Sequence, residues 1–350
     1  SCSVAMHPAR TTSTLARPAS RRLTISVATL AVLGALTAGQ GQAGSAAPGD
    51  ALAVAPVSTT YVELEQHRGS VTGDGRTVYL ANRTTFQPAR TTVALPPRLR
   101  ARAWVVVDLP TGRILGKHNP RRHLPQASTL KLLTALTATR TVAPSSRHRV
   151  TRFETSQVCS CAGLRRGTVY DRDTLLAAML LPSGNDAAEA VAGSHPRGRH
   201  AFYRAMNRVA ARLGATDTVA RNASGLTAAG SHSSARDLVV LLRAALRSDT
   251  VARILARPSA RIATVSGRYP HTVWRSTDYV NRYPGSLGKS GWTTPAQNTL
   301  VVATEIDGHR IGVATLGAPS GFSTSGARAL TGWASANFEG LKAVGRIPGG

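Results

Sequence analysis

Ser128-Thr129-Leu130-Lys131 places a serine hydroxyl and a lysine amine three residues apart in a chain of 350 residues. Apolar spacing over residues 128 to 140 predicts a helix, so the two side chains lie on one helical face and can meet. A serine hydroxyl needs a neighbouring base before it attacks a carbonyl, and a buried lysine beside another cation can be that base. Taken alone, the pair is better explained as an N-cap serine followed by a solvated lysine than as a nucleophile and its base.

Two further motifs follow in order. Ser183-Gly184-Asn185 lies 55 residues on, in a polar loop between two apolar segments, where Ser183 could relay a proton and Asn185 could hold a substrate amide. Lys289-Ser290-Gly291 lies 106 residues further on, within a strand predicted over residues 286 to 292. Its charge and hydroxyl suit a substrate carboxylate, and its glycine lets a peptide approach the strand edge. Each of these two motifs alone has an ordinary structural alternative. The first could be a turn that caps the next helix, and the second could be an edge strand protected by its lysine.

The rarity of lysine supports the chemical interpretation. The chain has four lysines and 39 arginines, and two of the four lysines, Lys131 and Lys289, lie in these motifs. Arginine cannot serve as a proton shuttle, because its guanidinium stays protonated. The three motifs in this order therefore predict an active-serine acyl-transfer site.

The chain around the motifs predicts an α+β fold. Residues 103–108 and 113–115 read as a hairpin, and residues 298–306 and 309–316 as a second one joined by Asp307-Gly308. Helical spacing is found over residues 174–181, 186–192, 201–213 and 234–246, and a terminal helix is expected over residues 324–341. We therefore predict an antiparallel sheet built from both ends of the domain and flanked by helices.

The N-terminal segment resembles a secretory signal peptide. It has no acidic residue before Asp50, and Arg21 and Arg22 precede an apolar run from Leu23 to Ala38 that ends in small residues. We assign residues 1–46 to a cleaved signal peptide, with an uncleaved anchor as the alternative. Either one places the protein outside the cytoplasm, secreted, associated with the cell wall or tethered to the membrane. Residues 47–98 read as a linker or small appended region, and residues 99–345 as the catalytic domain.

The charge and composition of the chain restrict the classes of partner that are expected. The net charge is +26, and loss of residues 1–46 removes four arginines and no acid, leaving +22. The arginines are spread along the chain without interleaved aromatic residues, so nucleic-acid binding is not expected. Adhesion to anionic wall polymers and a general bias toward arginine remain two open explanations.

The cysteines and histidines predict neither a metal nor a cofactor. Cys159 and Cys161 are one residue apart, and a tight disulfide between them is one open possibility in an oxidising compartment. None of the ten histidines forms an H-E-x-x-H motif, and the chain has no C-x-x-C pair.

Four segments carry a resemblance to a known family. They are residues 126–134 (QASTLKLLT), 181–188 (LPSGNDAA), 222–226 (NASGL) and 288–293 (GKSGWT). They closely resemble the serine-type D-alanyl-D-alanine carboxypeptidases, the low-molecular-mass penicillin-binding proteins of peptidase family S11. The resemblance covers about residues 102 to 341.

The resemblance implies a β-lactamase/penicillin-binding transpeptidase-like fold with a helical subdomain. It also implies removal of the terminal D-alanine from peptidoglycan stem peptides through an acyl-enzyme on Ser128, with β-lactams as covalent inhibitors. Lys131 would be the base, and Ser183 and Asn185 would form the second wall of the site. Substrate binding would fall to Lys289, Ser290, Gly291 and Trp292, with the N–H groups of Ser128 and Trp292 as the oxyanion hole.

The chain departs from the family pattern at Ser290, where threonine is usual, and at Gln126, where proline is usual. The hydroxyl at 290 is kept, and the change at 126 affects the loop more than the chemistry. Two alternatives stay open. A β-lactamase of the same fold would need a further acid, and no Glu-x-x-Leu-Asn segment follows Ser183. A catalytically silent, cationic wall-binding protein would have no reason to keep both lysines.

Overall fold

The computed structural model describes residues 62–64, 84–88, 94 and 96–349. The predicted signal peptide therefore lies outside the described residues. Within the described part of the chain, no helix combines the length and the apolar character needed to cross a membrane.

Strands from both ends of the chain form one antiparallel sheet. Its order is β1-β2-β4-β3-β11-β10-β9, with β12 paired to β2 and β13 paired to β4. The strands are β1 (Val62–Leu64), β2 (Thr84–Pro88), β3 (Ala103–Asp108), β4 (Arg113–His118), β9 (Leu287–Thr293), β10 (Gln297–Ile306), β11 (His309–Ala318), β12 (Leu341–Lys342) and β13 (Gly345–Arg346). Both predicted hairpins are confirmed as β3–β4 and β10–β11. Two strands, β1 and β2, come from the segment 47–98.

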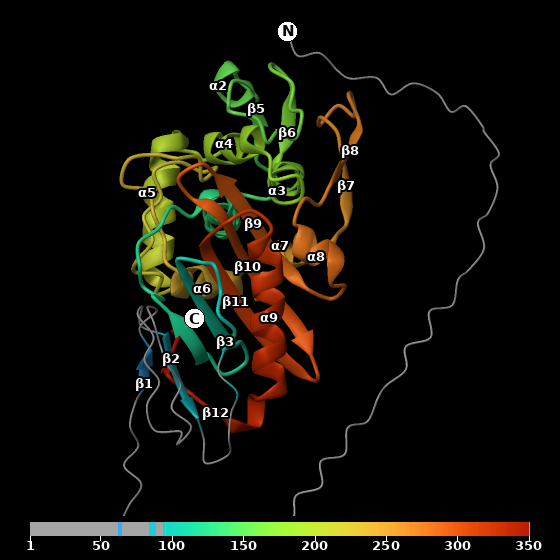
Figure 1. The fold of residues 1–350 in the computed structure, drawn as a ribbon. Helices are drawn as coiled ribbons and strands as arrows, with labels where there is room; N and C mark the ends of the chain where they lie inside the picture. The colour runs from blue at the N-terminus through green and yellow to red at the C-terminus, as the bar shows by residue number, and fades with distance from the viewer. Residues whose placement is uncertain (1–61, 65–83, 89–93, 95, 350) are drawn as a thin grey trace, which may run out of the picture. The chain divides into compact units, whose positions relative to one another are not determined.

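Both faces of this sheet are covered, which explains why residues 103–107 are apolar without alternation. Val105 and Val107 pack into one hydrophobic cluster together with α1 (Lys131–Thr141) and α6 (Ala235–Leu246). Trp104 and Val106 point the other way, into a second cluster that includes α9 (Phe322–Ala336). Figure 1 shows α9 lying along the sheet. The sheet is thus the middle layer between α9 and the helical part of the domain.

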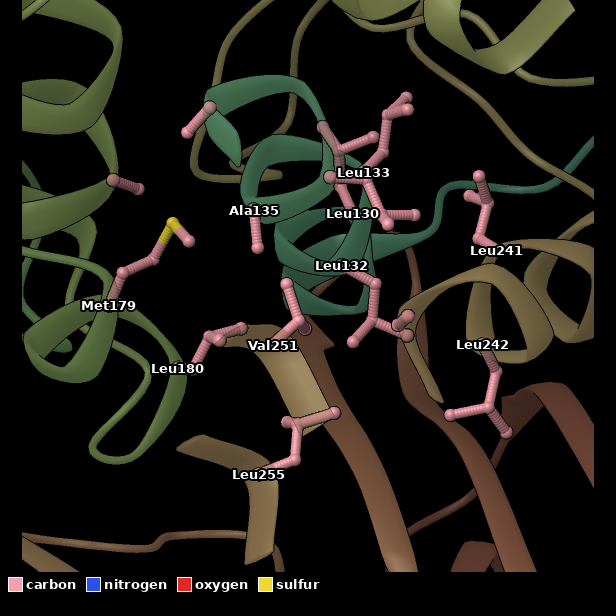
Figure 2. Close-up of a cluster of buried hydrophobic side chains, with 14 of the residues drawn as sticks. Leu130, Leu132, Leu133, Ala135, Met179, Leu180, Leu241, Leu242, Val251 and Leu255 are labelled. Atoms are coloured by element: carbon pink, nitrogen blue, oxygen red, sulfur yellow. The ribbon is translucent and has the colours of Figure 1, made fainter. Parts of the chain in front are cut away.

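The helical part is built around α1. It consists of the 3₁₀ turn η1 (Ala127–Leu130) and α1, together with α2 (Arg152–Thr155), α3 (Arg172–Leu180), α4 (Asn185–Gly193), α5 (Gly198–Arg212), α6 and α7 (Asp249–Ala256). Figure 2 shows Leu130, Leu132, Leu133 and Ala135 of η1 and α1 surrounded by side chains of α3, α6 and α7. Burying one leucine is worth roughly 2 kcal/mol, so this cluster fixes the helix that begins at Lys131.

The four predicted internal helices are confirmed as α3 to α6, with ends that differ by up to three residues. The predicted terminal helix is too long, because α9 ends at Ala336. Asn337 leaves the helical conformation, and its side-chain Nδ2 donates to the Trp333 carbonyl at 2.8 Å. The chain then forms the 3₁₀ turn η2 (Phe338–Gly340) and pairs with β2 through β12.

Several short elements were not predicted. They are α2, α7, α8 (Asp278–Arg282) and the pairs β5 (Arg147–Arg149) with β6 (Val169–Asp171) and β7 (Ser259–Ile262) with β8 (His271–Trp274). All of them except α7 have five residues or fewer, too few for a period to be recognised.

Candidate active site

Ser128 and Lys131 lie where η1 runs into α1. Ser128 is on the 3₁₀ turn and Lys131 is the first residue of α1. The Lys131 Nζ donates to the Ser128 Oγ at 2.8 Å. The structure thus places an amine directly on the candidate nucleophile, as the three-residue spacing predicts.

Lys131 is fully buried and uses three acceptors. Besides Ser128, its Nζ donates to Asn185 Oδ1 at 2.8 Å and to the Ser224 carbonyl at 2.7 Å. Burial lowers the pKa of Lys131 well below its usual value, and the positive charge of Lys289 lowers it further. The neutral amine, whose lone pair a general base requires, is therefore easier to form than for an exposed lysine.

The second motif forms the turn between α3 and α4. Ser183 has a positive φ of 67°, and Gly184 is the N-cap of α4. A Cβ on Gly184 would lie 2.7 Å from the Ala178 carbonyl oxygen, so this position needs glycine. Asn185 is the first residue of α4, and its Oδ1 points to Lys131.

The loop of Cys159 and Cys161 holds Asn185 from the other side. These cysteines form a disulfide. The Val158 carbonyl accepts from Asn185 Nδ2 at 2.7 Å, and the Ser160 carbonyl accepts from the Asn185 backbone N–H at 2.6 Å. Both polar atoms of the Asn185 side chain, Oδ1 and Nδ2, are therefore hydrogen-bonded.

Strand β9 carries the third motif at the edge of the sheet, next to η1. Lys289 is buried, and its Nζ donates to the Ser290 carbonyl at 2.8 Å. A Cβ on Gly291 would lie 2.5 Å from the Ser128 amide nitrogen, so only glycine permits this approach. The strand backbone therefore lies beside the N–H group of the candidate nucleophile.

The three motifs meet at one cavity of about 980 Å³. Six of the eight predicted residues line it, namely Ser128, Ser183, Asn185, Ser290, Gly291 and Trp292. Lys131 and Lys289 lie buried behind its wall. The cavity continues past the motifs to α8 and the start of α9, where Asp278, Arg282 and Thr324 line it. This extension gives room for more of a substrate than two residues.

Sequence reasoning assigned no role to three residues that shape the site. The Ser224 carbonyl accepts from Lys131. Gly225 has φ +83°, and a Cβ there would lie 1.9 Å from the Ala127 carbonyl oxygen. Thr299 Oγ1 on β10 lies 3.0 Å from the Gln126 carbonyl oxygen and 3.2 Å from that of Gly291, so it joins η1 to β9. Ser224 and Gly225 lie in the quoted segment 222–226, whereas Thr299 has no signal in the sequence.

Among the residues that the structure describes, no group of three or more His, Cys, Asp or Glu side chains is arranged to hold a metal ion. Around the three motifs, the polar groups at the cavity are hydroxyls, amides and the amines behind them. Such a set can take a proton from a hydroxyl, hold a carboxylate and bind an oxyanion.

Known proteins share both the sequence and the fold. The family model Peptidase_S11, described as D-alanyl-D-alanine carboxypeptidase, matches residues 90–320. The D-alanyl-D-alanine carboxypeptidase DacB2 of Mycobacterium tuberculosis is 36% identical over 219 residues, which cover 62% of this chain and 74% of that protein. The D-alanyl-D-alanine carboxypeptidase DacD of Escherichia coli is 29% identical over 271 residues, covering 72% of this chain and 67% of that protein.

Solved structures agree. The crystal structure of D-alanyl-D-alanine carboxypeptidase from Mycobacterium tuberculosis superposes with a TM-score of 0.69 at 34% identity, covering 75% of this chain and 99% of that one. The Streptomyces K15 DD-transpeptidase matches with a TM-score of 0.66 at 23% identity, covering 69% and 100%, and shows the fold alone. The predicted penicillin-binding transpeptidase-like fold is confirmed, and the chain belongs to the Peptidase_S11 family of D-alanyl-D-alanine carboxypeptidases.

Proposed function

We propose that this protein is an extracytoplasmic serine carboxypeptidase that removes the terminal D-alanine from peptidoglycan stem peptides through an acyl-enzyme on Ser128. The observation that carries the proposal is the 2.8 Å contact of the buried Lys131 amine with the Ser128 hydroxyl. Membership of the Peptidase_S11 family supports the substrate class.

The contact between Lys131 and Ser128 supports the following acylation step, in which the roles of Ser183 and Trp292 are those that the family resemblance implies. Neutral Lys131 takes the Ser128 proton as Oγ attacks the carbonyl of the penultimate D-alanine. The N–H groups of Ser128 and Trp292 bind the resulting oxyanion. The C–N bond then breaks, and the proton passes through the Ser183 hydroxyl to the leaving D-alanine nitrogen. Water hydrolyses the ester in the second half of the reaction and regenerates the serine.

The third motif holds the substrate's C-terminal carboxylate. Ser290 offers its hydroxyl from the cavity wall, and Lys289 supplies a positive charge behind it. β9 is an edge strand among the described strands, so an extended peptide can pair with it. A β-lactam presents the same carboxylate and a reactive amide, so it acylates Ser128 at the same site.

Export and wall adhesion complete the proposal. The apolar run from Leu23 to Ala38 supports an N-terminal export signal. The charge of +22 on residues 47–350 supports contact with anionic wall polymers.

The acyl-enzyme is tested by measuring the intact mass of the protein with and without benzylpenicillin, followed by peptide mapping. We expect one adduct on Ser128, and no adduct in Ser128→Ala. Ser323→Ala is the matched control, because it removes another hydroxyl from the cavity lining. A folded wild-type protein that forms no adduct would contradict the proposal.

A second prediction concerns pH. Burial lowers the pKa of Lys289 to about 7, so this amine is charged below that pH and neutral above it. We expect kcat/KM for a D-alanyl-D-alanine peptide, divided by that for the matching C-terminal amide, to fall by roughly tenfold between pH 6 and pH 8. Taking the ratio removes the contribution of Lys131.

Lys289→Arg is the control for this measurement, because arginine stays charged throughout this range. Its ratio should be flat with pH. A wild-type ratio that does not change between pH 6 and pH 8 would show that Lys289 does not hold the carboxylate by its charge.

A further inference from the structure

A buried carboxylate lies behind the active site. Glu189 is on α4, one helical turn after Asn185, and only 1% of it is exposed. Its Oε1 accepts from the Ala223 amide at 3.0 Å, and its Oε2 accepts from the Tyr203 hydroxyl. Arg199 Nε lies 3.5 Å from Oε2. Burial of a charged group costs free energy unless it is paired, and here the partners come from α5 and from the segment 222–226.

The segment that Glu189 holds is the one that meets Lys131. The Ala223 amide donates to Glu189, and the Ala223 carbonyl accepts from Thr134 Oγ1 at 2.7 Å. The next carbonyl along the chain, that of Ser224, accepts from Lys131 Nζ at 2.7 Å. Glu189 and Thr134 thus fix the peptide units on both sides of Ala223, and with them the direction of the Ser224 carbonyl.

We propose that Glu189 is a positioning residue for the general base, because it clamps the Ala223–Ser224 segment to the helix that carries Asn185. Two of the three acceptors of Lys131, Asn185 Oδ1 and the Ser224 carbonyl, then keep a fixed separation. The proposal rests on the function proposed above and adds to it a residue that touches neither the substrate nor the nucleophile.

The charge of Glu189 also acts on Lys131. It raises the pKa of Lys131, as Asp186 does, against the lowering by burial and by Lys289. The charged and titratable groups that face this cluster come from α1, α2, α4, α5, β5 and β9, and they are Lys131, Glu154, Asp186, Arg199, Tyr203, His148 and Lys289. On α3, Arg172 and Asp173 pair with each other. Removing the Glu189 charge therefore lowers the pH at which Lys131 becomes a base.

Glu154 provides a matched control. It is also a fully buried carboxylate, and it pairs with the same arginine, Arg199, and with His148. Its hydrogen bonds go to Thr151, His148 and Arg199, so it holds α2 and β5 rather than the segment 222–226. A change there tests the loss of a buried charge from the same cluster without loss of the clamp.

The experiment measures the rate of Ser128 acylation by benzylpenicillin from pH 5 to pH 9 in the full-length wild type, Glu189→Gln, Glu189→Ala and Glu154→Gln. In Glu189→Gln the amide oxygen still accepts from the Ala223 N–H, so the maximal rate should stay within about threefold while the acidic limb moves to lower pH. In Glu189→Ala the clamp is lost and the maximal rate should fall roughly 10- to 100-fold. Glu154→Gln should keep the wild-type profile.

Every outcome of this experiment either supports or contradicts the proposal. The clamp is overturned if Glu189→Gln, which keeps the acceptor for the Ala223 N–H, loses as much of the maximal rate as is expected for Glu189→Ala. The clamp is also overturned if folded Glu189→Ala reacts like the wild type. The effect of the Glu189 charge is overturned if Glu189→Gln keeps the wild-type acidic limb, or if Glu154→Gln shifts that limb equally. If Glu189→Ala does not fold, the maximal rate of the isosteric glutamine variant decides on the clamp, and its acidic limb decides on the charge. A wild type that forms no adduct contradicts the proposed function instead, so the two failures are distinguishable.

Discussion

Lys131→Arg will lower the rate of Ser128 acylation by benzylpenicillin by about 10³-fold or more, because the proposed base for the serine proton is lost. A guanidinium remains protonated at every pH at which the protein is folded, so it cannot accept a proton. The three acceptors of the Lys131 amine, Ser128 Oγ, Asn185 Oδ1 and the Ser224 carbonyl, surround it at 2.7–2.8 Å and leave no room for the larger head group. The loss therefore combines lost basicity with displaced neighbours.

Lys131→Met separates these two effects. Methionine has similar length and no charge, so it removes the base without inserting a larger cation. We expect a similarly large loss of acylation and a smaller loss of thermal stability than in Lys131→Arg. Lys117→Arg is the matched control, because this lysine lies on β4 and donates to the Val344 carbonyl at 3.0 Å, away from the cavity. Acylation of Lys131→Arg within tenfold of the wild type would show that another group takes the proton.

Gly225→Ala will abolish most acylation and will destabilise the fold. The added Cβ would lie 1.9 Å from the Ala127 carbonyl oxygen and 3.2 Å from the Ser128 amide nitrogen, and the backbone at φ +83° disfavours any side chain. Since the colliding atoms are backbone rather than a flexible side chain, η1 must move. A displacement of about 1 Å at a nucleophile costs roughly 100-fold in rate.

Gly267→Ala controls for the backbone conformation alone. Gly267 has φ +75°, close to that of Gly225, but a Cβ there would meet nothing within 4 Å. It should lose only about 1–2 kcal/mol of stability and keep the wild-type acylation rate. Thermal unfolding and acylation rates measured on both variants test the prediction. Equal behaviour of the two variants would show that the contact between residues 225 and 127 does not position Ser128.

Local sequence predicted much of the fold. Asp307-Gly308 marks the β10–β11 hairpin, because only a few residue types accept positive φ, and φ is +49° and +77° at these positions. The apolar spacing likewise predicts helices α3 to α6. The terminal helix was predicted five residues too long at its C-terminal end, because its end is set by Asn337 and by the pairing of Leu341 with Pro88. That pairing joins residues far apart in the chain and has no local signal.

The sequence by itself determined the family and predicted the chemistry of the site, because the proposed nucleophile, base and carboxylate-binding groups are side-chain types in a fixed order. Only the tertiary structure decided how these groups are tuned. The pKa values of Lys131 and Lys289 depend on burial by distant segments. The Ser224 carbonyl and Thr299 act through position alone, and a backbone carbonyl is present at every residue. Desolvation and hydrogen-bond geometry arise when the chain is folded, and no local pattern in the sequence encodes them.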